Sequence, residues 1–195
     1  MKTKSLLIAV LIFSFFSGAM QAQDKKKAVA EKNITWLGVD FTLARFTLVT
    51  EDPAAIVSTS LKAINNLILA EPDKYDLKKF FSKSEVTPDI EMVNERNSKI
   101  DPTMLVVPDK YAITPDDVKK VISSYDTKGK TGTGLVFVAE NLHKVEQTGS
   151  FYVVFFDMAS KEIIDSEHKV GKASGIGFRN YWTGSVYNVM KSWLK

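Results

Sequence analysis

The chain has 195 residues, of which 45% are hydrophobic and 25% charged, with a formal net charge of +3. This composition supplies enough apolar side chain for a buried core and excludes a disordered chain. The chain contains no cysteine, which excludes disulfides, thiolate nucleophiles, cysteine-ligated metals and the lipid-modified amino terminus of bacterial lipoproteins.

The first 22 residues are organised like a secretory signal peptide. Lys2 and Lys4 give a positive start, residues 5–16 form an almost unbroken apolar run, and small residues follow up to Ala22. The apolar run is too short for a membrane-spanning helix, which needs roughly 20 residues. We therefore expect a cleaved signal peptide, a protein exported to the periplasm or the exterior, and no transmembrane segment in the mature chain.

The remaining chain has a nearly balanced charge. Removing Lys2 and Lys4 lowers the total of lysine and arginine from 26 to 24, against 23 acidic residues, so the net charge falls to +1. This balance leaves no electrostatic footprint for nucleic acid, and we expect no nucleic-acid partner. The predicted division of the chain is a signal peptide at 1–22, a flexible lead-in at 23–32 and a single globular domain at 33–195.

Extended and helical patterns alternate in the first part of this domain. The β-branched and aromatic residues of 34–49 predict a long strand or a bent pair of strands. Asp52-Pro53 supplies a capping acceptor and a first-turn proline, which predicts a helix that ends at Glu71-Pro72. After it the pattern favours a short helix over 75–81 and strands over 86–93 and 104–107.

The second part carries the clearest patterns. Thr114-Pro115 begins a predicted helix, with acidic residues at the positive end of its dipole. Strands are predicted over 135–140, 150–158 and 162–170, and a last helix over 181–194. The order of elements predicts an α+β fold: one antiparallel or mixed β-sheet with helices packed on it and the C-terminal helix docked on the sheet.

Two glycine-rich segments resemble phosphate-binding loops but lack the context of such loops, and the second also lacks the first glycine of a P-loop, since Ser124 stands at that position. Residues 171–177 match the GxxxGxG pattern of short-chain dehydrogenases, and Tyr187 and Lys191 match their Tyr-x-x-x-Lys pair. However, the chain ends 18 residues after Gly177, which leaves no room for a ribose-binding acid or further crossover units. Gly129-Lys130-Thr131 follows a predicted helix instead of a strand. We expect no cofactor, and we interpret these glycines as turn residues.

The sequence nominates no catalytic and no metal-binding residue. His143 and His168 are the only histidines, and neither has the HExxH-type spacing of a zinc site. Asp165 and Glu167 share the strand face opposite to His168, so the nearest acids point away from the imidazole. His168 is therefore expected to be a surface residue on an edge strand. No Gly-x-Ser-x-Gly motif is present.

An aromatic-rich segment beside the last glycine-rich loop is the main candidate for a functional surface. Five aromatic residues fall within residues 178–193, and aromatic and arginine side chains are enriched at binding hot spots. Trp182 and Trp193 are expected to dock the helix on the sheet. The candidate partner or ligand surface comprises Phe178, Arg179, Asn180, Tyr181 and Tyr187.

The C-terminal third also resembles a known pattern. A strand, the turn Met158-Ala159-Ser160-Lys161-Glu162, a second strand, a glycine-rich loop and a final helix are similar to periplasmic α/β domains of the curli-secretion lipoprotein and penicillin-binding-protein-activator type. This chain lacks the lipidated cysteine of those families, so the resemblance implies no outer-membrane anchor. The chain more closely resembles exported proteins of Bacteroides-type bacteria, a resemblance that implies no activity and no functional residue.

Together these features predict a non-catalytic exported envelope protein that binds a protein or polymer partner. Two alternatives stay open: an envelope hydrolase with a dispersed active site, and a small-ligand-binding domain. A deep cleft with convergent acidic, histidine or arginine groups would favour the hydrolase. An enclosed apolar cavity would favour the small-ligand-binding domain.

Overall fold

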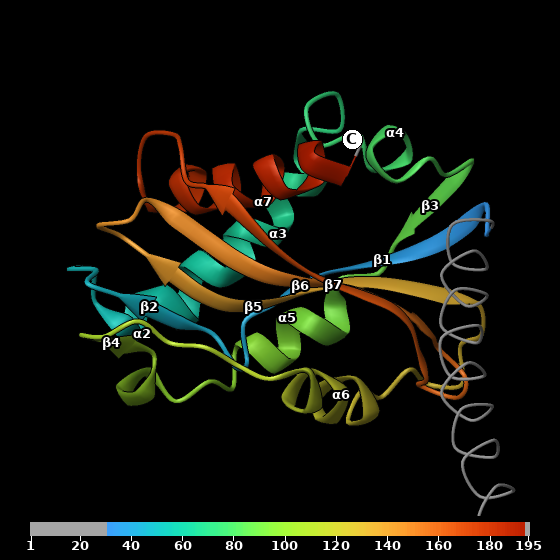
Figure 1. Cartoon of the computed structure of the whole chain (residues 1–195), viewed down its shortest axis with the longest axis horizontal. Coiled ribbons are helices and arrows are strands. Elements are labelled where there is room, and N and C mark those ends of the chain that lie inside the picture. The colour runs from blue at the N-terminus through green and yellow to red at the C-terminus, as the bar shows by residue number, and fades with distance from the viewer. Residues whose placement is uncertain (1–30, 194–195) are drawn as a thin grey trace, which may run out of the picture.

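A seven-stranded mixed sheet with helices on both faces forms the body of the molecule (Figure 1). The computed structural model describes residues 31–193, so the predicted signal peptide at 1–22 and most of the lead-in at 23–32 lie outside the described residues. The strands are β1 (Asn33–Asp40), β2 (Arg45–Thr47), β3 (Glu85–Pro88), β4 (Val106–Val107), β5 (Thr133–His143), β6 (Thr148–Asp157) and β7 (Ile163–Lys172). The helical elements are α2 (Pro53–Ala55), η1 (Ile56–Ser60), α3 (Leu61–Ala70), α4 (Leu77–Phe81), α5 (Glu91–Asn97), η2 (Pro102–Met104), α6 (Pro115–Ser123) and α7 (Phe178–Trp193).

Strand β5 is the centre of the sheet. Along its whole length it pairs antiparallel with β6, and β6 pairs antiparallel with β7. On its other edge β5 pairs in parallel first with β1 and then with β2. Strand β1 pairs in parallel with β3, and β2 pairs in parallel with β4. The predicted mixed sheet is confirmed, and the predicted bent pair over 34–49 is β1 followed by β2.

Two separate cores cover the two faces of this sheet. Helices α3, α4 and α7 pack on the first face, and α5 and α6 pack on the second (Figure 1). Burial on both sides explains why ten consecutive residues of β5, up to Leu142, are buried. Aromatic edge-to-face contacts, such as Trp36 with Phe137 at 5.3 Å between ring centroids, fill the first core.

Side-chain amides replace a neighbouring strand where β1 gives way to β2. The flanking strand β3 ends at Pro88, and β4 begins only at Val106. In this gap the buried Asn65 side chain accepts from the Val39 N–H at 2.7 Å and donates to its carbonyl at 3.1 Å. The buried Asn97 side chain also donates to the Val39 carbonyl, at 2.9 Å. The backbone is therefore satisfied although no strand lies on this side of β1.

Two predicted helix starts are confirmed, and one predicted strand is partly wrong. Asp52 caps α2, and helical structure continues through a π-helical stretch to Ala70. Thr114 and Asp117 form a reciprocal capping box at α6. The strand predicted over 86–93 is β3, which ends at Pro88, followed by α5, which begins at Glu91. The Asp89 N–H still donates to the Trp36 carbonyl at 2.8 Å, so Pro88 does not end the contact with β1.

Helix α7 lies directly against β7, as the predicted docking of the C-terminal helix requires. It begins at Phe178 instead of Tyr181, and it buries Trp182, Val186, Val189 and Met190. A Cβ atom on Gly171 would lie 2.0 Å from the Ser185 carbonyl oxygen, so only glycine allows this approach of helix to strand. Gly171 is thus a packing residue inside β7.

Candidate functional site

The carboxyl ends of β2, β4, β5 and β7 lie at one end of the sheet, because these strands run in the same direction. In α/β sheets, ligands commonly bind outside the carboxyl ends of the strands. Here these ends lead into the segment 48–52, the β5–β6 turn at 144–147 and the β7–α7 loop at 173–177. This end of the molecule is on the left in Figure 1.

Backbone hydrogen bonds join these segments into one surface. The Lys144 N–H donates to the Thr47 carbonyl at 3.0 Å, which ties the β5–β6 turn to the end of β2. The Ala173 N–H donates to the Gln147 carbonyl at 2.7 Å, which ties the same turn to the β7–α7 loop. The Lys144 ammonium also lies 4.0 Å from the ring centroid of Tyr181, at the start of α7.

Large apolar side chains are exposed on this surface. Leu48 is 47% exposed, Val145 70% and Ile176 92%, one on each segment. A single exposed apolar side chain is ordinary, but several of them on adjoining segments are typical of an interaction surface. We call the surface formed by Leu48, Val145, Ile176, Arg179 and Tyr181 the end surface.

Of the predicted surface residues, Phe178 and Tyr187 are packed against the first core. The Phe178 ring stacks on the buried Phe46 with centroids 5.4 Å apart. Tyr187 contacts the rings of Tyr75 and Phe80 edge-on, at 5.8 Å in both cases. Both side chains are half-buried, so they link α7 to the core as well as reaching its surface.

Arg179, Asn180 and Tyr181 form the exposed side of the first turn of α7. Arg179 is exposed, and its Nε donates to the Asn180 side-chain oxygen at 3.1 Å. Tyr181 is half-buried, and burial raises the pKa of its hydroxyl, which is therefore neutral at physiological pH. The structure thus brings three of the predicted residues together beside the β7–α7 loop and places Tyr187 further along the helix.

A β-bulge organises the polar side chains on the second face near this end. The pairing of β5 with β6 shifts between Ala139 and Asn141. Asn141 donates to the Thr47 hydroxyl at 2.7 Å and to the Arg45 carbonyl at 3.0 Å. The Ser150 hydroxyl accepts from the Asn141 N–H and donates to the Asn141 carbonyl, both at 3.2 Å. The Ser150 hydroxyl thus closes the bulge instead of standing free for nucleophilic attack.

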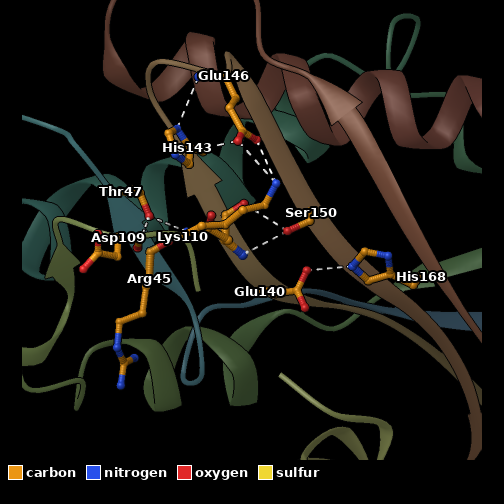
Figure 2. Close-up of polar contacts among 10 residues, drawn as sticks. Arg45, Thr47, Asp109, Lys110, Glu140, His143, Glu146, Ser150 and His168 are labelled. Carbon is orange, nitrogen blue, oxygen red and sulfur yellow. Dashed lines mark hydrogen bonds and ion pairs between the residues drawn. The ribbon is translucent and has the colours of Figure 1, made fainter. Parts of the chain in front are cut away.

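The bulge also directs Glu140 toward His168 on β7. A Glu140 oxygen lies 2.6 Å from His168 Nε2, and its other oxygen accepts from the Ile113 N–H at 3.1 Å (Figure 2). The Glu140 side chain is 8% exposed and the His168 side chain 42%. His168 is on an edge strand, as expected, and its ring contacts Glu140, which is 28 residues away in sequence. Sequence reasoning missed Glu140 because neither the bulge nor the strand register is visible in the sequence.

Tyr152 completes this row of side chains across β5, β6 and β7. Its ring centroid lies 4.9 Å from that of His168, and its hydroxyl donates to the Ile113 carbonyl at 3.2 Å. Burial, and then the nearby Glu140 charge, raise the pKa of the Tyr152 hydroxyl. The row places an imidazole within hydrogen-bond distance of a carboxylate and beside a tyrosine ring.

His143 belongs to a second polar group at the end of β5. The Glu146 N–H donates to His143 Nδ1 at 3.2 Å, so that nitrogen is an acceptor and the ring proton resides on Nε2. Glu146 also pairs with Lys110 at 3.1 Å (Figure 2). Within residues 31–193 no three histidine, aspartate or glutamate side chains are grouped so that they could hold a metal ion.

Comparisons with protein families, curated proteins and solved structures found no match to this chain. The fold is therefore described by its topology alone: a mixed α/β sheet with a parallel core, antiparallel β5–β7 hairpins and a C-terminal helix on β7. Among residues 31–193, no helix has the length and apolar character needed to span a membrane.

Proposed function

We propose that this chain is a non-catalytic exported envelope protein that binds a protein partner through its end surface. The observation that carries the proposal is the exposure of Leu48, Val145 and Ile176 on segments that hydrogen bonds hold together. Removing such a surface from water favours association by about 25 cal/mol for each Å² of apolar area.

Aromatic and arginine side chains beside the apolar group support the same proposal. Tyr181 and Arg179 lie on the first turn of α7, next to the loop that carries Ile176. Tyrosine and arginine are enriched among residues that dominate binding energy. Export, and with it an envelope location, is part of the proposal and rests on residues 1–22 of the sequence.

Affinity capture from envelope extracts of the native host tests the proposal. The baits are the wild-type chain, an Ile176→Asp/Val145→Asp variant, and an Ala159→Asp variant as control. Ala159 is exposed in the β6–β7 turn, at the opposite end of the sheet. We expect the wild type and the control to recover the same protein and the double variant to lose it at least tenfold.

Equal recovery by all three baits would contradict binding at the end surface. Recovered material that resists protease would identify a polymer partner instead. Phe178 is not substituted, because its stacking on Phe46 would confuse loss of binding with loss of packing.

The Glu140–His168 pair is the specific observation that favours the alternative of a hydrolase. An imidazole oriented by a carboxylate can serve as a general base, and this pair is partly open to solvent. The alternative stays a prediction, tested by hydrolysis of p-nitrophenyl acetate with the wild type and with His168→Gln. A rate above the buffer rate that disappears in the variant would favour it.

A further inference from the structure

A depression of about 410 Å³ lies where β1 ends, outside the end surface. Three of its lining side chains are cations, Arg45, Arg96 and Lys99, and two are apolar, Ile100 and Met104. The depression exists because the chain leaves the sheet at 41–44, while Asn97 at the end of α5 donates to the backbone of β1. Thr42 from this excursion lines it as well.

Arg45 is a half-buried cation without an acidic partner. Its Nη1 donates to the Ala44 carbonyl at 2.8 Å and to the Leu43 carbonyl at 3.5 Å. Its guanidinium lies 5.0 Å from the ring centroid of Tyr111. No acidic side chain in the described part of the chain, residues 31–193, forms an ion pair with it. Figure 2 shows the side chain extending away from the other labelled residues.

A fully buried carboxylate holds Arg96 in place. Asp40 accepts from Arg96 Nε at 3.3 Å and from the Tyr125 hydroxyl at 2.8 Å. The Arg96 guanidinium lies 4.9 Å from the Tyr125 ring centroid, and its side chain is 26% exposed. This contact uses Nε, so the two terminal NH₂ groups keep the paired donor geometry that suits an oxyanion.

The other two charged residues that line the depression are Lys99 and Asp101. Lys99 pairs with Glu95 at 2.9 Å, but both side chains are more than 60% exposed, at 70% and 64%. Such a pair contributes little and is readily exchanged. Asp101 also lines the depression, and it accepts from the N–H and hydroxyl of Thr103 at 2.9 and 2.8 Å. Those bonds lower the pKa of Asp101, which is therefore ionised.

We propose that this depression binds a phosphate monoester that carries an apolar substituent. The phosphate lies between the guanidinium groups of Arg45 and Arg96, with Lys99 as a third cation. The substituent lies on Ile100 and Met104, which is 58% exposed. Arg45 has no acidic partner within residues 31–193, and the contact of Arg96 with Asp40 uses Nε alone. The pair of Lys99 with Glu95 is exposed and weak. The two guanidinium groups therefore match a dianionic phosphate, with its three terminal oxygens, better than a monoanionic carboxylate.

Isothermal titration of the chain with n-hexyl phosphate, inorganic phosphate and hexanoate tests this site. We expect hexyl phosphate to bind more tightly than inorganic phosphate, and hexanoate not to bind measurably. Arg45→Gln should weaken the binding of hexyl phosphate by about tenfold, and Lys99→Gln should weaken it by roughly threefold. Met104→Ser should weaken the binding of hexyl phosphate but not that of inorganic phosphate. Lys62→Gln, an exposed substitution of equal charge on α3, is the control.

The two possible sources of the ester are distinguished by vesicles that contain phosphatidic acid. If the chain binds these vesicles and Arg45→Gln abolishes that binding, the ligand is a lipid headgroup. If the chain binds hexyl phosphate but not the vesicles, the ligand is a soluble ester. Far-UV circular dichroism checks that Arg45→Gln is folded. Because the Lys99 side chain is exposed, Lys99→Gln should leave the fold unchanged and tests the site separately. Absence of hexyl phosphate binding, or equal binding by Arg45→Gln, Lys99→Gln and Lys62→Gln, would overturn the proposal. Neither outcome depends on partner binding at the end surface.

Discussion

At the scale of single residues, the Asp40 carboxylate links three parts of the chain through its hydrogen bonds. It is fully buried at the end of β1 and accepts hydrogen bonds from the Thr42 backbone, the Thr42 hydroxyl, Arg96 and the Tyr125 hydroxyl. A buried carboxylate is tolerated only when such partners replace water. Asp40 therefore joins the excursion at 41–44 to α5 and to Tyr125, the second residue after α6.

Asp40→Asn should lower the free energy of unfolding by about 2–4 kcal/mol, because a charged acceptor is lost and Arg96 is left without its counter-ion. Chemical denaturation measures this change. Glu95→Gln, which breaks the exposed pair with Lys99, should change stability by no more than about 0.5 kcal/mol. Equal effects of the two substitutions would contradict the buried role of Asp40.

Tyr125 should be silent in an alkaline titration of the native protein. Burial, and then the Asp40 charge, raise the pKa of its hydroxyl well above 10. Absorbance at 295 nm up to pH about 11 should therefore have the same amplitude in the wild type and in Tyr125→Phe. In denaturant the same substitution should remove one phenolate of the six tyrosines. The raised pKa stabilises the fold below pH 10, and this stabilisation is lost as the pH rises further.

At the scale of elements, sequence patterns predicted the helix starts that nearby residues determine. They missed the contacts that depend on the pairing of strands far apart in the sequence. The caps at Asp52 and Thr114 act within a few residues, so both helix starts were visible in the sequence. Helix α5 was missed because Pro88 and the short β3 precede it without a side-chain cap. The Glu140–His168 contact depends on a bulge and on strand register, and neither has a local signal.

The junction of α7 with β7 depends on the absence of a side chain at Gly171. A Cβ atom there would lie 2.0 Å from the Ser185 carbonyl oxygen, so Gly171→Ala must push the helix away from the strand. We expect a loss of about 2–3 kcal/mol in chemical denaturation. Ser166→Ala, on the exposed side of the same strand, should stay within about 0.5 kcal/mol of the wild type. A neutral Gly171→Ala would contradict this packing.

At the scale of the whole molecule, the chain carries two surfaces with different chemistry. The end surface is apolar and aromatic and is formed by segments after β2, β5 and β7. The depression at the end of β1 has three cations among its seven lining residues. The sequence predicted part of the end surface through Arg179, Asn180 and Tyr181. It could not predict Leu48 or Val145, because only the parallel pairing of β2 with β5 brings their segments together.

Photo-crosslinking in the native host tests the end surface most directly. p-Benzoylphenylalanine replaces Ile176, Val145 or Leu48 in turn, and Ala159 at the opposite end of the sheet as the control position. The account predicts the same protein adduct from positions 176, 145 and 48 and none from position 159. Adducts from position 159 alone, or the same adduct from every position, would contradict it.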